Sequence, residues 1–150
     1  MSKGTHVSAG GDVFQVEREV FGSMSIDFKV STSDTNGGFF VLENTDAFKG
    51  GPPRHLHHEQ EECFYVVEIG DERYRLGPGD SVLAPRKVPH VWAHIGEGTG
   101  RLIVAFQPAG EMEAFFGELA KVDGAPQPAE LRELFRSHGM EVTGPPLAVA

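Results

Sequence analysis

The sequence predicts an all-β domain that ends in one or two helices. Its 150 residues suit a single domain, in which a chain of this size buries roughly two-thirds of its unfolded surface. The 19 glycines and 10 prolines fall mostly between short apolar runs, as expected for short strands joined by turns. After Pro108 the apolar spacing becomes helical, which places the helices at the C-terminal end.

Alternating apolar residues predict the first strands. Residues 13–17 and 24–30 alternate, and the Asn-Gly-Gly sequence at 36–38 supplies the positive φ angles of a turn. The chain is then predicted to return as a strand over 39–43, with Phe39 on the same face as the other odd-numbered residues. Further strands are predicted at 64–69, 73–76, 81–84, 90–94 and 101–106.

Two helices are predicted after the strands. Met112, Phe115, Phe116 and Leu119 recur at helical spacing, and Pro128 starts a second such stretch that Gly139 ends. The predicted organisation is therefore a flexible lead over 1–12, a barrel over 13–110, and helices with a tail packed on the barrel over 111–150.

Composition excludes several classes of function. The net charge is −9 and no basic patch is present, so we expect no nucleic-acid partner. No apolar run is long enough to span a bilayer, and the first residues lack the apolar core of a signal peptide. A single cysteine, Cys63, excludes an intrachain disulfide. We therefore expect a cytoplasmic protein with no membrane partner.

Candidate metal ligands concentrate in residues 51–65, GPPRHLHHEQEECFY. His55 and His57 are two apart, so an extended backbone places both imidazoles on one face. Glu62 follows in the same stretch, and His90 lies in a second segment, APRKVPHVW. Three imidazoles and one carboxylate form a ligand set for a divalent transition metal. The alternative is that the histidines are exposed residues of a polar loop.

These two segments resemble the paired motifs of the cupin superfamily. The first motif is matched by Gly51, then His55-x-His57, then Glu62 followed by x-Phe-Tyr-Val, and the second by the residues from Gly79 to His90. The chain is most similar to small bacterial single-domain cupins that resemble quercetin dioxygenases. The resemblance implies a jelly-roll-like double-stranded β-helix, which is often a homodimer, with a metal inside bound by His55, His57, Glu62 and His90.

One feature departs from the cupin pattern. The segment between the two motifs is several residues shorter than usual, and the missing residues fall where cupins carry a further strand. A tight turn near residues 66–67, or a partner chain that completes the sheet, restores the strand direction that His90 requires.

The ligand set leaves the metal open among iron, manganese, nickel, zinc, cobalt and copper. Four protein ligands on an octahedral ion leave two neighbouring positions, which suits catalysis. A structural zinc site is more often closed and rich in cysteine. Glu62 is also a candidate proton acceptor, since a carboxylate ligand can leave the ion to take a substrate proton.

Four further residues are candidates for the site. His94 shares a strand face with His90 and is either a proton donor or acceptor beside the metal, or a histidine at the rim bonded to a backbone carbonyl. Phe64, Trp92 and Phe39 are candidates for the wall of a substrate pocket, with core packing as their alternative. For Phe39 core packing is the favoured interpretation.

Three functions fit these residues. The first is an oxygenase that acts on a small aromatic or enolic molecule. The second is a non-redox isomerase, cyclase or lyase that uses the ion as a Lewis acid, and the third is a ligand-binding protein without enzymatic activity. Fold does not choose among them, because one fold carries many chemistries.

Overall fold

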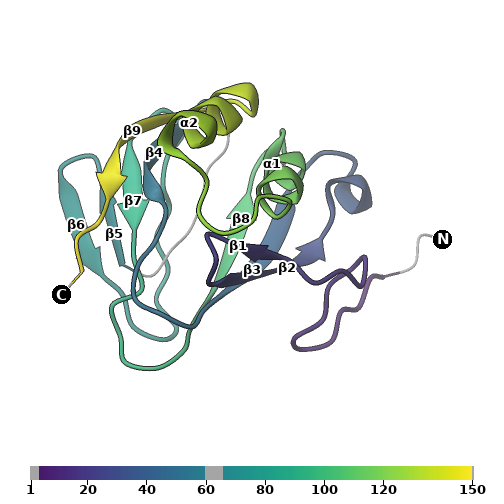
Figure 1. Cartoon of the computed structure of the whole chain (residues 1–150). Helices are drawn as coiled ribbons and strands as arrows, with labels where there is room; N and C mark the ends of the chain where they lie inside the picture. Colours follow the sequence, from purple (N-terminus) through teal and green to yellow (C-terminus); the bar gives the residue numbers. More distant parts are fainter. Residues whose placement is uncertain (1–3, 60–65, 150) are drawn as a thin grey trace.

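The computed structural model describes residues 4–59 and 66–149, which form two sheets with helices at one end (Figure 1). The first sheet has the order β1-β2-β3-β8, with β1 (Glu19–Val20), β2 (Met24–Val30), β3 (Phe40–Asp46) and β8 (Gly100–Phe106). The second has the order β6-β5-β7-β4-β9, with β6 (Glu72–Arg75), β5 (Val66–Ile69), β7 (His90–Trp92), β4 (Pro53–His57) and β9 (Met140–Pro146). The remaining elements are the 3-10 helix η1 (Thr32–Thr35), α1 (Met112–Leu119) and α2 (Pro128–Ser137).

One apolar core joins the two sheets and the helices. Phe40 of β3 stacks on Phe106 of β8, with ring centroids 5.9 Å apart. Phe115 of α1 meets Phe135 of α2 edge to face at 4.9 Å, and both rings are buried. The predicted all-β barrel with C-terminal helices is therefore confirmed. Along the described residues, no helix is both long and apolar enough to cross a membrane.

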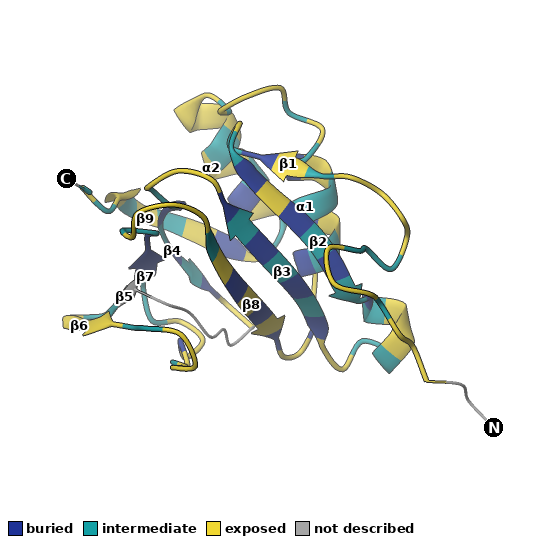
Figure 2. Cartoon of the chain, turned by 90° about the horizontal axis from the view of Figure 1, so that it is seen from below, coloured by how far each residue is buried: buried dark blue, intermediate teal, exposed yellow. Residues whose placement is uncertain are grey.

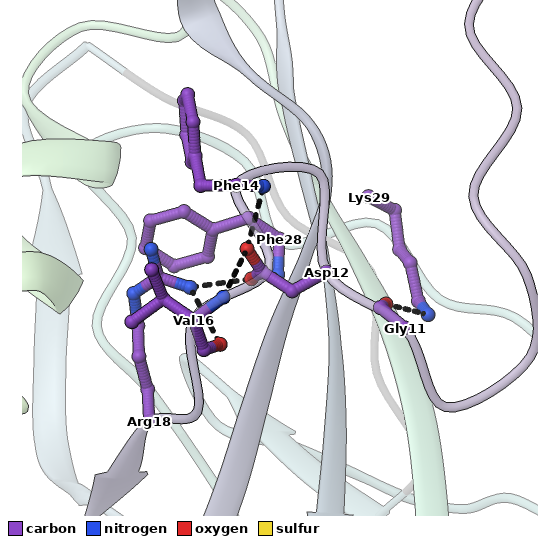
Figure 3. Close-up of polar contacts among 7 residues, drawn as sticks. All are labelled: Gly11, Asp12, Phe14, Val16, Arg18, Phe28 and Lys29. Atoms are coloured by element: carbon purple, nitrogen blue, oxygen red, sulfur yellow. Dashed lines mark hydrogen bonds and ion pairs between the residues drawn. The ribbon is translucent and has the colours of Figure 1, made fainter.

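The prediction of a strand over 13–17 is wrong, because the Asp12 side chain binds backbone N–H groups there (Figure 3). Its carboxylate accepts hydrogen bonds from the backbone N–H groups of Phe14 at 2.8 Å and Phe28 at 2.6 Å. It also forms an ion pair with Arg18, whose guanidinium lies 3.7 Å from the centroid of the Phe28 ring. A side chain that bonds nearby N–H groups competes with strand pairing, and here it ties the segment to β2.

The strand predicted over 81–84 is also absent as a regular element. Residues 81–83 are irregular, and Ala84 forms only an isolated bridge. The other strand predictions agree with the structure to within a few residues, and 24–30 coincides with β2.

Phe39 does not pack in the core, contrary to the favoured interpretation. Phe39 precedes β3 and is 42% exposed, whereas the even-numbered residues of the strand are buried, as the alternating colours of β3 show (Figure 2). The inward face of β3 consists of Phe40, Leu42, Asn44 and Asp46. The phase follows from pairing with β8, in which Phe40 lies opposite Phe106 and both rings enter the core.

The C-terminal segment returns to the second sheet. Gly139 has a φ of 78°, which permits the chain to leave α2 and enter β9. β9 then pairs antiparallel with β4, with Met140 opposite His57. The outer edge of the strand that carries two of the candidate ligands is thereby covered.

Candidate metal centre

Strands β4 and β7 place three candidate ligands side by side. The two strands pair antiparallel with His55 opposite His90, and His57 lies one strand repeat further along β4. The three imidazoles are almost fully buried, with exposures of 5% for His55 and 1% for His57 and His90. They are therefore not residues of a polar loop.

The loop before β7 compensates for the short segment between the two motifs. β5 turns directly into β6, and β7 then enters between β5 and β4, antiparallel to both. Two backbone hydrogen bonds hold the entry to β7, from Lys87 to the His57 carbonyl at 2.7 Å and from Gly70 to the Pro89 carbonyl at 2.9 Å. Lys87 has a φ of 65°, a conformation that glycine adopts more readily. The β5–β6 hairpin and this loop together give β7 the direction that His90 requires, and the turn expected near residues 66–67 is absent, because both residues lie within β5.

The spacing of the histidines suits a metal ion. One nitrogen from each of His55, His57 and His90 lies within 4.8 Å of the other two. The rings of His57 and His90 are nearly parallel, at 5°, with centroids 5.3 Å apart. Metal–imidazole bonds are about 2.1 Å long, so small side-chain adjustments bring all three nitrogens to one ion.

Backbone carbonyls set the tautomers of two histidines. Nδ1 of His55 lies 2.8 Å from the Pro53 carbonyl, and Nδ1 of His90 lies 3.0 Å from the Val88 carbonyl. A carbonyl oxygen only accepts, so each Nδ1 carries the proton. Each Nε2 therefore presents a lone pair, as in most histidines that bind metals. These residues are suited to hold a metal ion.

An apolar cavity of about 40 Å³ adjoins His55 and His57. Among its described lining residues, Asn44 is the only polar side chain besides these two histidines. Four phenylalanines from β8 and the helices contribute to its wall, Phe106, Phe115, Phe116 and Phe135. The cavity therefore disfavours bulk water next to the imidazoles.

The structure describes only two of the four remaining predicted site residues. Glu62 and Phe64 lie outside the described residues. Trp92 is 7% exposed and lines both the apolar cavity and a larger, open one. His94 lines only the larger cavity, and its Nε2 lies 2.9 Å from the Gly98 carbonyl. That contact is the one expected of a histidine at the barrel rim.

Gly100 makes room for the His94 ring. A Cβ atom at Gly100 would lie 2.5 Å from Nδ1 of His94, closer than real Cβ atoms approach other atoms. Position 100 lies opposite Asp46 in the pairing of β8 with β3. The imidazole therefore lies near Asp46, the last residue of β3.

Two buried polar residues of β3 were missed by the sequence analysis. Nδ2 of Asn44 donates a 2.7 Å hydrogen bond to Oδ2 of Asp46, and each residue is 2% exposed. Burial raises the pKa of the Asp46 carboxyl, against smaller lowering effects of the Asn44 hydrogen bond and the His94 charge. The predicted strand ended at Glu43, before both residues, and its inward face was assigned to the odd-numbered positions.

The fold and the buried imidazoles define an all-β barrel protein with an internal site suited to a metal. A family model for the Cupin domain matches residues 47–106, a range that contains all three histidines. Residues 47–106 therefore match the cupin domain that the two motifs predicted. A search of the curated proteins gave no matching relative.

Solved structures support this fold. The structure of KdgF from Halomonas sp. is similar with a TM-score of 0.58 and 20% identity, over 74% of this chain and 99% of that one. An RmlC-like cupin from Shewanella frigidimarina NCIMB 400 has a TM-score of 0.53 and 22% identity, over 75% and 99%. A Streptomyces PAC13 variant with uridine has a TM-score of 0.54 and 13% identity, over 75% and 88%.

Proposed function

We propose that this cupin is a metal-dependent enzyme and that it oxygenates a small aromatic or enolic molecule. The observation that carries the proposal is the buried trio His55, His57 and His90, two of whose tautomers are set by backbone carbonyls. When bound, a redox-active ion would supply neighbouring positions at which an enolate and dioxygen react. The resemblance of the motifs to those of quercetin dioxygenases supports the same chemistry.

The side chains around the trio have separate tasks in this proposal. His55, His57 and His90 hold the ion, and Glu62 is the proposed fourth ligand and the acceptor of the substrate proton. The apolar cavity of about 40 Å³ is large enough for one small molecule, since a single water needs about 10–15 Å³ by the same measure. Its apolar walls favour an apolar gas such as dioxygen over water.

The polar end of β3 supports a second function. Asn44 and Asp46 are buried hydrogen-bonding groups that oxygenation does not require. Such groups suit a non-redox isomerase, cyclase or lyase, in which the ion acts as a Lewis acid while side chains move protons.

Metal content and oxygen consumption test the two functions. Elemental analysis of purified protein comes first, followed by oxygen-electrode assays with flavonols, diketones and catechols. We expect iron, nickel, manganese, cobalt or copper, together with substrate-dependent oxygen uptake. Zinc in the protein and no oxygen uptake with any of these substrates would favour the Lewis-acid function.

A pair of adjacent histidines tests the site itself. His57→Ala removes a buried candidate ligand, whereas His58→Ala removes its exposed neighbour on the same segment. We expect the first variant to lose stoichiometric metal and activity, and the second to keep both. Metal retained by His57→Ala at the wild-type level would refute the trio as the metal site.

We also propose that the protein is a homodimer. Large apolar side chains remain exposed on the single chain, among them Phe48, Leu83 and Ile103. Burial of such residues between two copies would stabilise an association. Sedimentation as a monomer at micromolar concentration would refute this proposal.

A further inference from the structure

The strand that carries His55 and His57 has an arginine on its other face. The two histidines of β4 are buried, whereas Arg54 and Leu56 alternate with them and are half-buried. Arg54 therefore points away from the imidazoles, towards the outer face of the second sheet. Its side chain is only 23% exposed and has polar contacts on that face. Arg54 lies close to the candidate metal centre but is not placed to be a ligand.

The guanidinium of Arg54 reaches across β7 to the end of β5. In the sheet order, β7 lies between β4 and β5. Nη2 of Arg54 donates a 2.7 Å hydrogen bond to the carbonyl of Gly70, the residue that follows β5. Nη1 lies 3.4 Å from the carboxylate of Glu68 within β5. One side chain therefore connects β4 to β5 and spans β7, the strand of His90.

The contacts of Arg54 continue to the residue before His90. The backbone N–H of Gly70 donates a 2.9 Å hydrogen bond to the Pro89 carbonyl, and Nη2 of Arg54 lies 3.5 Å from the same oxygen. The neighbouring Val88 carbonyl lies 3.0 Å from Nδ1 of His90. Arg54 is therefore linked, through Gly70 and Pro89, to the loop that places His90 and sets its tautomer.

Strand pairing holds β7 more firmly to β5 than to β4. Within residues 4–59 and 66–149, β7 pairs with β5 at three residue pairs, but with β4 only where His90 lies opposite His55. Outside the two strands, an isolated bridge joins Gly50 to His94. The distance between the imidazoles of the two strands therefore depends on how β4 docks against the β5–β7 pair. Arg54 is the β4 side chain that bonds to that pair.

The strand on the other edge of β4 leaves space for the arginine. The pairing of β4 with β9 shifts register on both sides of Arg54, and Gly144 lies opposite it. A Cβ at Gly144 would lie 3.3 Å from both Cβ and Cδ of Arg54, which is tighter than most contacts of this kind. An irregular ladder with a glycine at a close approach is typical of strands that accommodate a neighbouring group. The local structure of β9 therefore fits the stem of Arg54.

We propose that Arg54 is a positioning residue for the metal centre, which fixes the distance between the imidazole of His90 and the two imidazoles of β4. The inference rests on the proposed metal function, since these imidazoles hold the ion in that proposal. Groups that orient metal ligands contribute about 10- to 100-fold to metal affinity. Arg54 acts from the outer face of the sheet, through the backbone of Gly70 and Pro89.

Cobalt binding to the full chain tests this role. The apparent Kd for Co²⁺ is measured by competition with a chelating dye in the wild type and in three variants. We expect Arg54→Met to bind Co²⁺ about 10- to 100-fold more weakly. Arg54→Lys should lie between Arg54→Met and the wild type, because an ammonium is a point charge without the fork of donors of a guanidinium. Arg73→Met is the matched control, since Arg73 lies 3.7 Å from the same Glu68 carboxylate but is 66% exposed, and its affinity should be unchanged.

A measurement on the metal-free protein separates a failure of this inference from a failure of the proposed metal function. Long-range ¹H–¹⁵N NMR at mildly alkaline pH shows which ring nitrogen of each histidine carries the proton. In the wild type, His55 and His90 should both be protonated at Nδ1. In Arg54→Met, His90 should become a mixture of tautomers. His55 should keep its proton at Nδ1, because its partner, the Pro53 carbonyl, belongs to the same strand.

Circular dichroism and thermal unfolding verify that each variant is folded, and Arg54→Lys decides the matter should Arg54→Met not fold. A wild type that binds no Co²⁺ would refute the metal function, and the tautomer of His90 would then decide the role of Arg54. A folded variant at position 54 that keeps both the wild-type tautomers and any wild-type Co²⁺ affinity would overturn the proposal. An equal loss of affinity in Arg73→Met would also overturn it.

Discussion

The Asp46→Asn substitution should stabilise the metal-free protein at neutral pH. Asp46 is 2% exposed and has one hydrogen bond, donated by Asn44, which an asparagine at position 46 still accepts through its own carbonyl. The substitution removes the cost of burying an under-satisfied charge. That cost is on the order of 1–3 kcal/mol, and about 2–4 °C in Tm corresponds to each kcal/mol in a domain of this size.

The raised pKa of Asp46 determines how this stability difference changes with pH. The pKa of Asp46 is raised in the folded protein above its ordinary value of 3.8, so the folded state binds the proton more tightly than the unfolded state. The contribution of Asp46 to stability is therefore most favourable below 3.8. It is lost as the pH rises from 3.8 through the raised pKa. The advantage of Asp46→Asn should be near zero at the acidic end and should reach its maximum above that window.

Thermal unfolding followed by circular dichroism between pH 3.5 and 8 measures both effects. Asp123→Asn is the matched control, because Asp123 is exposed and its substitution should shift Tm little at any pH. A variant at position 46 that is less stable than wild type at pH 7 would refute the reasoning. A stability difference that does not change with pH would refute the assignment to a raised pKa.

Two other substitutions test local packing. A Cβ at Gly51 would lie 2.0 Å from the carbonyl oxygen of Trp92, so Gly51→Ala should destabilise the protein by about 2 kcal/mol or more. At Gly117 in α1 nothing lies within 4 Å of an added Cβ, so Gly117→Ala should stabilise the protein by up to about 1 kcal/mol. Equal effects of the two substitutions in chemical denaturation would contradict this. Asp12→Ala should cost about 1–3 kcal/mol and speed hydrogen exchange at the Phe28 amide, which it now binds at 2.6 Å; unchanged exchange would show that the segment is held by other contacts.

Local patterns were sufficient for much of the fold. The alternation of β2 and the apolar spacing of α1 predicted both elements, because each buries one face with a simple period. They were not sufficient for residues 13–17, where a hydrogen-bonding side chain at Asp12 overrides the alternation. For β3 the strand was predicted but its face was not, since a shift of one residue exchanges the two sides of a strand. That shift placed Phe39 inward, and the predicted strand also ended at Glu43, before Asn44 and Asp46.

The sequence by itself determined the cupin-like motifs, the all-β class with C-terminal helices, and the histidines to consider as ligands. These follow from residue types at short spacings, which a strand translates directly into shared faces. Only the tertiary structure decided that His90 pairs across from His55, that carbonyls of Pro53 and Val88 set the tautomers, and that Asp46 is buried. Such relations join residues far apart in the chain, and the register between strands, rather than any local pattern, creates them.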